Sequence, residues 1–303
     1  MNKFAMRRIS TYAKRLCRFL PAGAFVLLAA GIAPLAAQPD ETYNFNPGRP
    51  GFTYGSTPLI RHTISAEAYV RVEGYTAESF KHGGALLNRY TFRYSPLDRL
   101  ELGIGVGLYA YAFSFDKPMV DLSALSLMAR VNILRKSGLK PGLALIGELG
   151  LPAGSKSYFF VEPGVKPSAV IVLDHNYKRF GFFYNVGAEW STAYHATSLF
   201  YAVMVCYGAD AAGRINLYGE FVGSHTWNLQ PYYMLPQPAS RAKYDRVRTN
   251  KLDDTFVLRV GADFFITKAF KLDCSFATNL QSPHSLQGEI GLAYGIPLKK
   301  LKR

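Results

Sequence analysis

Hydrophobic and polar positions alternate strictly in residues 100–110, "LELGIGVGLYA". Leu, Ile, Val and Ala occupy the even positions, and Glu, Gly and Tyr occupy the odd ones. Successive side chains of a β-strand point to opposite faces, so this pattern predicts a strand with one apolar and one polar face. The alternation leaves open whether the apolar face contacts a protein core or lipid.

Similar stretches recur between turn-forming segments along most of the chain. The segments around Leu143 and Val170 fit least well, because "LALIGEL" alternates poorly and "SAVIVL" is apolar on both faces. About twelve strands are predicted, at residues 64–74, 86–94, 100–110, 122–133, 143–151, 167–174, 180–190, 198–207, 215–224, 255–266, 270–279 and 286–296.

The predicted connections alternate in length. Short turns follow the even-numbered strands, whereas the odd-numbered strands are followed by longer segments at residues 75–85, 112–121, 152–166 and 225–254. An even number of strands with this asymmetry is typical of bacterial outer-membrane barrels, and closure leaves no unpaired strand edge in lipid. We therefore predict an all-β fold: an antiparallel transmembrane β-barrel of about twelve strands with periplasmic N- and C-termini. A soluble β-sandwich or lipocalin-like barrel shows the same period and stays an alternative.

The first residues predict export. Residues 1–18 carry basic side chains and no acid, and an apolar run broken by Gly31 and Pro34 follows them. This is typical of a secretory signal peptide, which we place at residues 1–37. The alternative is a retained anchor, but the run is shorter than the roughly 20 residues that a spanning helix needs. Export and a barrel together predict the outer membrane of a Gram-negative bacterium.

Three further regions follow the signal peptide. We assign residues 38–61 as a Pro/Gly-rich N-terminal lead-in, residues 62–298 as the barrel domain and residues 299–303 as a basic C-terminal tail. We expect the lead-in to be periplasmic; the alternative is that it folds into the barrel mouth as a plug.

Several short motifs resemble one family. They are "RPGFTYGSTPL" (49–59), "LLNRYTFRYSPLDRLELGIGVG" (86–107), "LPAG" (151–154) and "NLYGEFVG" (216–223). They resemble the outer-membrane β-barrel "transporter" family named for the meta-pathway of phenol degradation. The resemblance covers most of the chain after the signal peptide and implies a role in the uptake of small compounds, aromatic ones included. It carries over no catalytic residue.

The C-terminus departs from the usual barrel pattern. Outer-membrane barrels commonly end on an aromatic residue, whereas this chain ends "YGIPLKKLKR". Either Tyr294 or Ile296 serves as the effective strand end, or the tail is a periplasmic extension.

Charged residues on the polar faces of the strands are the main candidates for function. In a barrel they point inward, where they either line a water-filled channel or pair across the lumen and close it. The candidate lumen-lining residues are Glu67, Arg71, Arg89, Arg93, Glu101, Arg130, Glu148, Glu189, Glu220, Arg259, Asp263, Asp273 and Glu289.

A long connection carries a second candidate site. Five of its basic residues form a candidate outer-loop patch for lipopolysaccharide phosphates or an anionic solute; the alternative is a solvated charged loop. They are Arg241, Lys243, Arg246, Arg248 and Lys251. The formal net charge of +14 does not by itself indicate nucleic acid, since no binding motif accompanies it, so we predict no nucleic-acid partner.

Enzymatic signatures are weak. The chain has no G-x-S-x-G, H-E-x-x-H, Walker or calcium-loop motif, so we predict no catalytic residues, no metal and no cofactor. Ser224 with His225, or His284 with Ser285, would need partners from adjoining strands to act as a nucleophilic pair. Cys206 and Cys274 fall on opposite faces, so we predict no disulfide between them.

These observations favour an outer-membrane barrel that acts as a passive channel or facilitator for small solutes, aromatic or hydrophobic ones included. One alternative is a closed structural or binding barrel that acts through its loops. A less favoured alternative is an outer-membrane lipid-modifying enzyme. The expected partners are outer-membrane lipid, lipopolysaccharide and a small-molecule solute, and the sequence does not fix the oligomeric state.

Overall fold

The computed structural model describes residues 52–77, 80–113, 119–121, 125–153, 164–192, 196–210, 214–227, 255–280 and 285–298. These residues all belong to one compact unit, residues 43–303. The signal peptide, the first part of the lead-in, the outer-loop basic patch and the C-terminal tail, all predicted from the sequence, lie outside the described residues.

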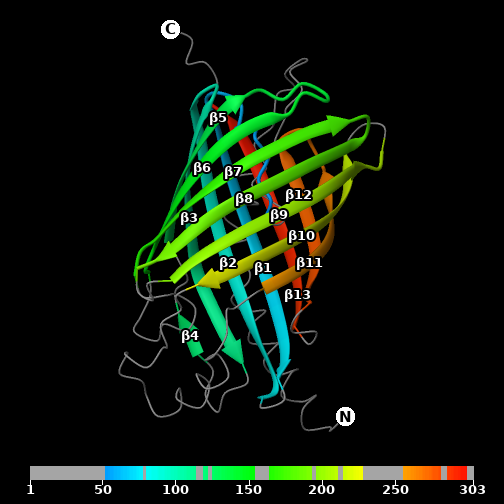
Figure 1. Ribbon diagram of the computed structural model, residues 1–303. Coiled ribbons are helices and arrows are strands. Elements are labelled where there is room, and N and C mark those ends of the chain that lie inside the picture. The colour runs from blue at the N-terminus through cyan, green and yellow to red at the C-terminus, as the bar shows by residue number, and fades with distance from the viewer. Residues whose placement is uncertain are drawn as a thin grey trace. The chain divides into compact units, whose positions relative to one another are not determined.

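The described residues form thirteen β-strands (Figure 1). They are β1 (Thr63–Ala77), β2 (Phe80–Leu97), β3 (Leu100–Phe113), β4 (Met119–Asp121), β5 (Leu125–Leu134), β6 (Gly142–Leu151), β7 (Lys166–Tyr177), β8 (Phe180–Ser191), β9 (Ala196–Gly208), β10 (Ile215–Trp227), β11 (Thr255–Phe265), β12 (Phe270–Asn279) and β13 (Ser285–Pro297).

The strands close into a single antiparallel barrel. Consecutive strands pair with each other except β4 and β5, and β1 pairs with β13 from Thr63 opposite Pro297 to Tyr75 opposite Ser285. Both β4 and β5 pair with β3, along different parts of its length, so the ring has twelve strand positions. The predicted all-β fold, a closed antiparallel barrel of about twelve strands, is confirmed, whereas the periplasmic position of the termini stays a prediction. Within the described residues, no helix is long and apolar enough to cross a membrane.

The two ends of the barrel differ in their connections. At the turn end, where β1 begins and β13 finishes, residues 98–99, 178–179 and 266–269 link neighbouring strands. At the loop end, β6 ends at Leu151 and β10 ends at Trp227, and the long connections predicted at residues 152–166 and 225–254 lie mostly outside the described residues. The predicted long connection at residues 75–85 is wrong, because β1 and β2 continue pairing as far as Ala77 opposite Phe80.

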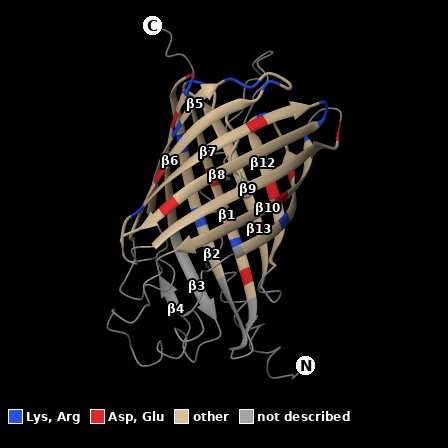
Figure 2. Ribbon diagram, viewed as in Figure 1, with Lys and Arg blue, Asp and Glu red and all other residues tan. Residues whose placement is uncertain are grey.

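Most of the described strands present an apolar face outward, and their inner faces carry the buried charges, together with buried apolar side chains on β6, β7 and β9. On β7, Ile171 and Leu173 are exposed, whereas Val172 and Asp174 are buried. The polar partners follow the register around the ring: Glu220 lies opposite Arg259, and Asp263 lies opposite Asp273. Charged residues accordingly appear along the strands as well as at the turns (Figure 2).

Candidate functional site

The chain just before β1 lies inside the barrel. Residues 52–60, which we call the inner segment, contact side chains of β3, β5, β8 and β10. These strands are spread around the ring, so a buried segment that contacts all four occupies the lumen. This is the plug-like placement that the sequence left as an alternative to a periplasmic lead-in.

Glu220 on β10 anchors the start of the inner segment. Its Oε1 accepts hydrogen bonds from the backbone N–H of Phe52 (2.8 Å) and Thr53 (2.7 Å) and from the hydroxyl of Thr53 (2.6 Å). Arg259 lies beside Glu220 at 3.7 Å and stacks over the ring of Phe52, 4.9 Å from its centroid. The buried carboxylate of Glu220 therefore balances the charge of Arg259 and accepts hydrogen bonds from two backbone N–H groups of the inner segment.

Tyr54 fixes the middle of the inner segment. Its backbone N–H donates to Asn185 Oδ1 (2.6 Å), and Asn185 Nδ2 donates back to its carbonyl (3.0 Å). The ring packs against an inner apolar cluster of Ile146, Val170, Val172 and Ala144. Burial, together with the nearby carboxylate of Glu148, raises the pKa of the Tyr54 phenol above its usual range, so it stays a neutral donor.

The inner segment then runs to the turn end. Asn132 Nδ2 donates to the carbonyl of Ser56 (3.0 Å), and Glu101 accepts from the backbone N–H of Leu59 (2.8 Å). Gly142 on β6 makes room for this path, because a Cβ at that position would overlap the hydroxyl of Ser56. Side chains of the barrel wall thus form the hydrogen bonds to the backbone N–H and C=O groups of this segment that a neighbouring strand would form in a sheet.

The turn half of the lumen holds a network of buried charges. Arg93 donates to Glu67 through Nε (2.8 Å) and lies 2.9 Å from Glu101 through Nη1. Arg130 Nη1 also approaches Glu101, at 3.4 Å. All four side chains are almost fully buried, and each charge has an opposite partner, as charges out of water require.

Other inner-face charges pair within one strand, between neighbouring strands, with a turn or, for Arg89 on β2 and Glu148 on β6, between strands that β3 and β5 separate. Lys271 lies 3.4 Å from Asp263 and 3.9 Å from Asp273. The remaining pairs are Lys136 with Asp174, Arg71 with Glu289, Arg89 with Glu148 and Lys166 with Glu189.

Exposure of the inner charges increases toward the loop end. On β2, the Arg93 side chain is 1% exposed, whereas Arg89, four residues nearer the loop end, is 34% exposed. On β1, Arg71 is likewise more exposed than Glu67. The lumen is therefore packed at the turn end and more open toward the loop end.

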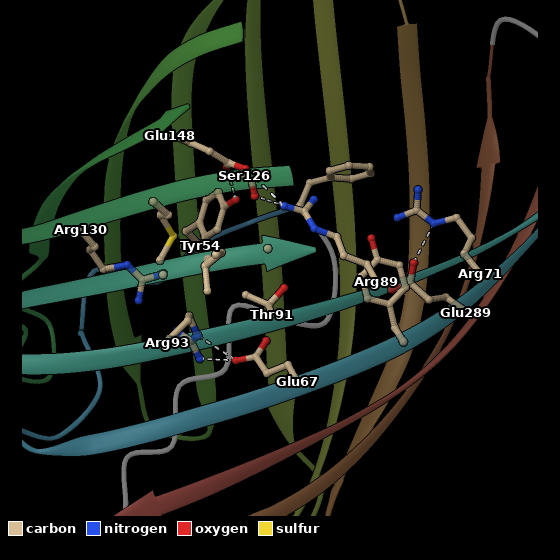
Figure 3. A pocket seen from close by; sticks show the side chains of 16 residues that line it. Tyr54, Glu67, Arg71, Arg89, Thr91, Arg93, Ser126, Arg130, Glu148 and Glu289 are labelled. Atoms are coloured by element: carbon tan, nitrogen blue, oxygen red, sulfur yellow. Dashed lines mark hydrogen bonds and ion pairs between the residues drawn. The ribbon is translucent and has the colours of Figure 1, made fainter. Parts of the chain in front are cut away.

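A cavity of about 120 Å³ lies between the inner segment and the wall formed by β13, β1, β2, β3, β5 and β6. Among the lining side chains, Figure 3 shows Arg130 and Arg93 toward one side and Arg89 and Arg71 toward the other, with Tyr54 between Arg130 and Arg89. Arg89 packs closely over Gly105, where a Cβ would collide with the guanidinium.

All thirteen predicted lumen-lining residues lie on the inner face, and nine of them are buried. Lys271 was not predicted, although it shares the alternating face of Asp273 and was therefore detectable. Asn132 and Asn185 were not predicted either, because they bind an inner segment that strand periodicity does not reveal. Asp174 was also not predicted; its partner is Lys136, in the turn between β5 and β6.

The described residues contain little that suggests other chemistry. No group of three His, Cys, Asp or Glu residues within them is placed to hold a metal ion. Cys206 and Cys274 are free; the register puts Cys206 on the inner face with Tyr218, and Cys274 on the outer face with Ile290. His225 packs among aromatic rings, tilted against Tyr201 and edge-on to Phe256, and His284 lies outside the described residues.

No protein-family model and no curated protein sequence matches this chain. The resemblance to barrels named for phenol degradation therefore stays a prediction. Among solved structures, the crystal structure of an outer membrane channel from Pseudomonas putida F1 is similar, with a TM-score of 0.59 and 14% identity over 80% of this chain and 98% of that chain. A KdgM porin in complex with disordered oligogalacturonate aligns with a TM-score of 0.48 and 9% identity over 76% of this chain and 98% of that chain.

The likeness to the Pseudomonas putida F1 channel concerns the fold, since identity is low. It agrees with the closed ring of twelve strand positions described above. The chain therefore has the closed antiparallel β-barrel fold found in outer-membrane channels.

Proposed function

We propose that this protein is an outer-membrane channel through which small solutes diffuse passively, and that the inner segment restricts its lumen at the turn end. The observation that carries the proposal is the arrangement of the two faces. A closed ring places charged side chains inward and exposed aliphatic and aromatic side chains outward. Such a distribution suits a barrel with lipid outside and water inside.

The channel function rests on the open part of the lumen. Arg89, Glu148 and Arg71 keep partial exposure on the inner face, so they are placed to meet solutes that enter from the loop end. We propose that the inner charges tune ion preference. The outer-loop residues Arg241, Lys243, Arg246, Arg248 and Lys251 remain a proposed contact for lipopolysaccharide, and small aromatic compounds remain a proposed class of solute.

A closed barrel that acts through its loops is the second candidate. The observation that favours it is the packing of the turn half, where Arg93, Glu101 and Arg130 are buried beside the inner segment. In this arrangement, passage through the turn end requires the inner segment to move. The two candidates therefore differ in whether that movement occurs in the membrane.

Single-channel recording in a planar bilayer tests the proposal. The chain is folded in detergent, its insertion is verified, and current is recorded with unequal salt on the two sides. We expect discrete current steps, and we expect Arg89→Gln to shift the reversal potential toward cation preference, because it removes a partly exposed inner cation. Arg179→Gln, at an exposed turn, is the matched control. Verified insertion without current would overturn the channel and favour the closed barrel.

A further inference from the structure

Arg130 presents an unused hydrogen-bonding edge inside the barrel. Its guanidinium is 0% exposed, and Nη1 donates to the carbonyl of Thr57 (3.3 Å) and approaches Glu101. Nε and Nη2 are buried and have no hydrogen-bond partner in the described structure. A buried N–H donor without an acceptor is costly, so this edge is suited to an acceptor that the described chain does not supply.

The geometry of that edge specifies the acceptor. The N–H groups of Nε and Nη2 lie side by side and point the same way, which matches the two oxygens of a carboxylate. The nearest protein carboxylates have other partners, since Glu101 and Glu67 are held by Arg93. A single water oxygen can also accept from both N–H groups, but a carboxylate gives each N–H its own charged acceptor, and charge-assisted hydrogen bonds are roughly twice as strong as neutral ones.

The cavity beside Arg130 has further features of a small-solute site. Arg89, on its other side, also has a buried Nε without a hydrogen-bond partner (Figure 3). Tyr54 and Met128 supply apolar surface, and Thr91 supplies a hydroxyl. The volume of about 120 Å³ is comparable with that of cavities, roughly 150 Å³, that admit benzene. A ligand of this site is therefore a small molecule.

We propose that this cavity binds the carboxylate group of a small organic acid, with Nε and Nη2 of Arg130 holding its two oxygens. The inference rests on the proposed function, because it assumes that solutes enter the lumen. It names a solute class for that function, small carboxylic acids. Arg89 faces the same ligand from the opposite wall.

Calorimetric titration of the folded chain in detergent tests the site. Sodium propionate is compared with propionamide, which has a similar shape but no charge and only one carbonyl oxygen, at constant ionic strength. We expect saturable binding of propionate and no measurable binding of propionamide. Arg130→Lys keeps the charge but loses the paired edge, so propionate should bind at least about tenfold more weakly. Arg179→Lys, at an exposed turn, should bind propionate as the parent chain does.

The acid and amide comparison needs no variant, so the test stands even if Arg130→Lys fails to fold. Absence of propionate binding, equal binding of the two compounds, or unchanged binding by a folded Arg130→Lys variant would each overturn the site. The bilayer recording separates the two proposals: current without propionate binding overturns the site alone. Propionate binding by a barrel that never conducts overturns the channel and leaves the site.

Discussion

Arg93 shows how single residues hold the lumen together. It contacts two carboxylates, those of Glu67 and Glu101, on the two neighbouring strands β1 and β3, and all three side chains are almost fully buried. A buried ion pair is not necessarily more stable than an apolar replacement, but removing one partner leaves an uncompensated charge. Removing Arg93 alone should therefore lower the stability of the barrel much more than replacing the whole ion pair with apolar side chains would.

Replacing Arg93 with Met should strongly destabilise the barrel. The change leaves Glu67 buried without its guanidinium partner, and breaking a buried pair in this way costs about 3–5 kcal/mol. Urea unfolding of the protein refolded into lipid vesicles measures the loss. Arg135→Met is the control, because its 3.9 Å contact with Asp98 is largely exposed and such pairs contribute about 0–1 kcal/mol. Similar losses for both variants would show that the buried network contributes little.

At the scale of elements, the inner segment is the part whose position depends most on the rest of the fold. Its backbone hydrogen bonds go to side chains of the wall, notably Glu220, Asn185 and Glu101, whereas every described strand except the short β4 is paired on both sides. Fewer interactions therefore hold the segment than hold a strand. If a described element moves while the barrel stays closed, we expect it to be this segment.

Locking the inner segment should reduce conductance. A Cβ on Gly142 would overlap the hydroxyl of Ser56, so cysteines at both positions lie within reach of a disulfide. In a background with Cys206→Ser and Cys274→Ser, the oxidised Ser56→Cys, Gly142→Cys variant should show smaller or rarer current steps, and reductant should restore them. Each single cysteine variant is the control. Current unchanged by the oxidised crosslink would mean that solutes pass without movement of the segment.

The sequence predicts the strands better than it predicts the inner segment, for physical reasons. Alternation marks a strand wherever one face meets an apolar environment, so all twelve predicted strands are present. It fails at residues 75–85, where "YTAESFKHGGA" shows no alternation although β1 and β2 keep pairing. It also weakens around Val170, because that inner position packs against Tyr54. The inner segment shows no alternation of apolar and polar residues, because it pairs with no strand. Its backbone N–H groups instead bond side chains of the barrel wall.

At the scale of the molecule, the outer surface decides between a membrane barrel and a soluble one. Ile171 lies in the middle of β7 with 53% of its surface exposed, and its register partners Leu145 and Val186 are also exposed and apolar. Monomeric soluble proteins rarely expose contiguous apolar surface on this scale. If this surface contacts lipid, the cost of placing a charge on it should depend on how deep in the bilayer the residue lies.

Replacing Ile171 with Arg should destabilise the barrel in lipid by about 2–4 kcal/mol, the cost of a charge near the bilayer midplane. Ile215→Arg, at the turn end of β10, should cost only about 0–1 kcal/mol, because the side chain lies near the interface. Both residues are exposed and apolar, so the pair differs mainly in depth. Urea unfolding in phospholipid vesicles measures both values. A soluble barrel with a water-exposed outer face would tolerate the two substitutions alike, and equal costs would contradict the membrane-spanning arrangement.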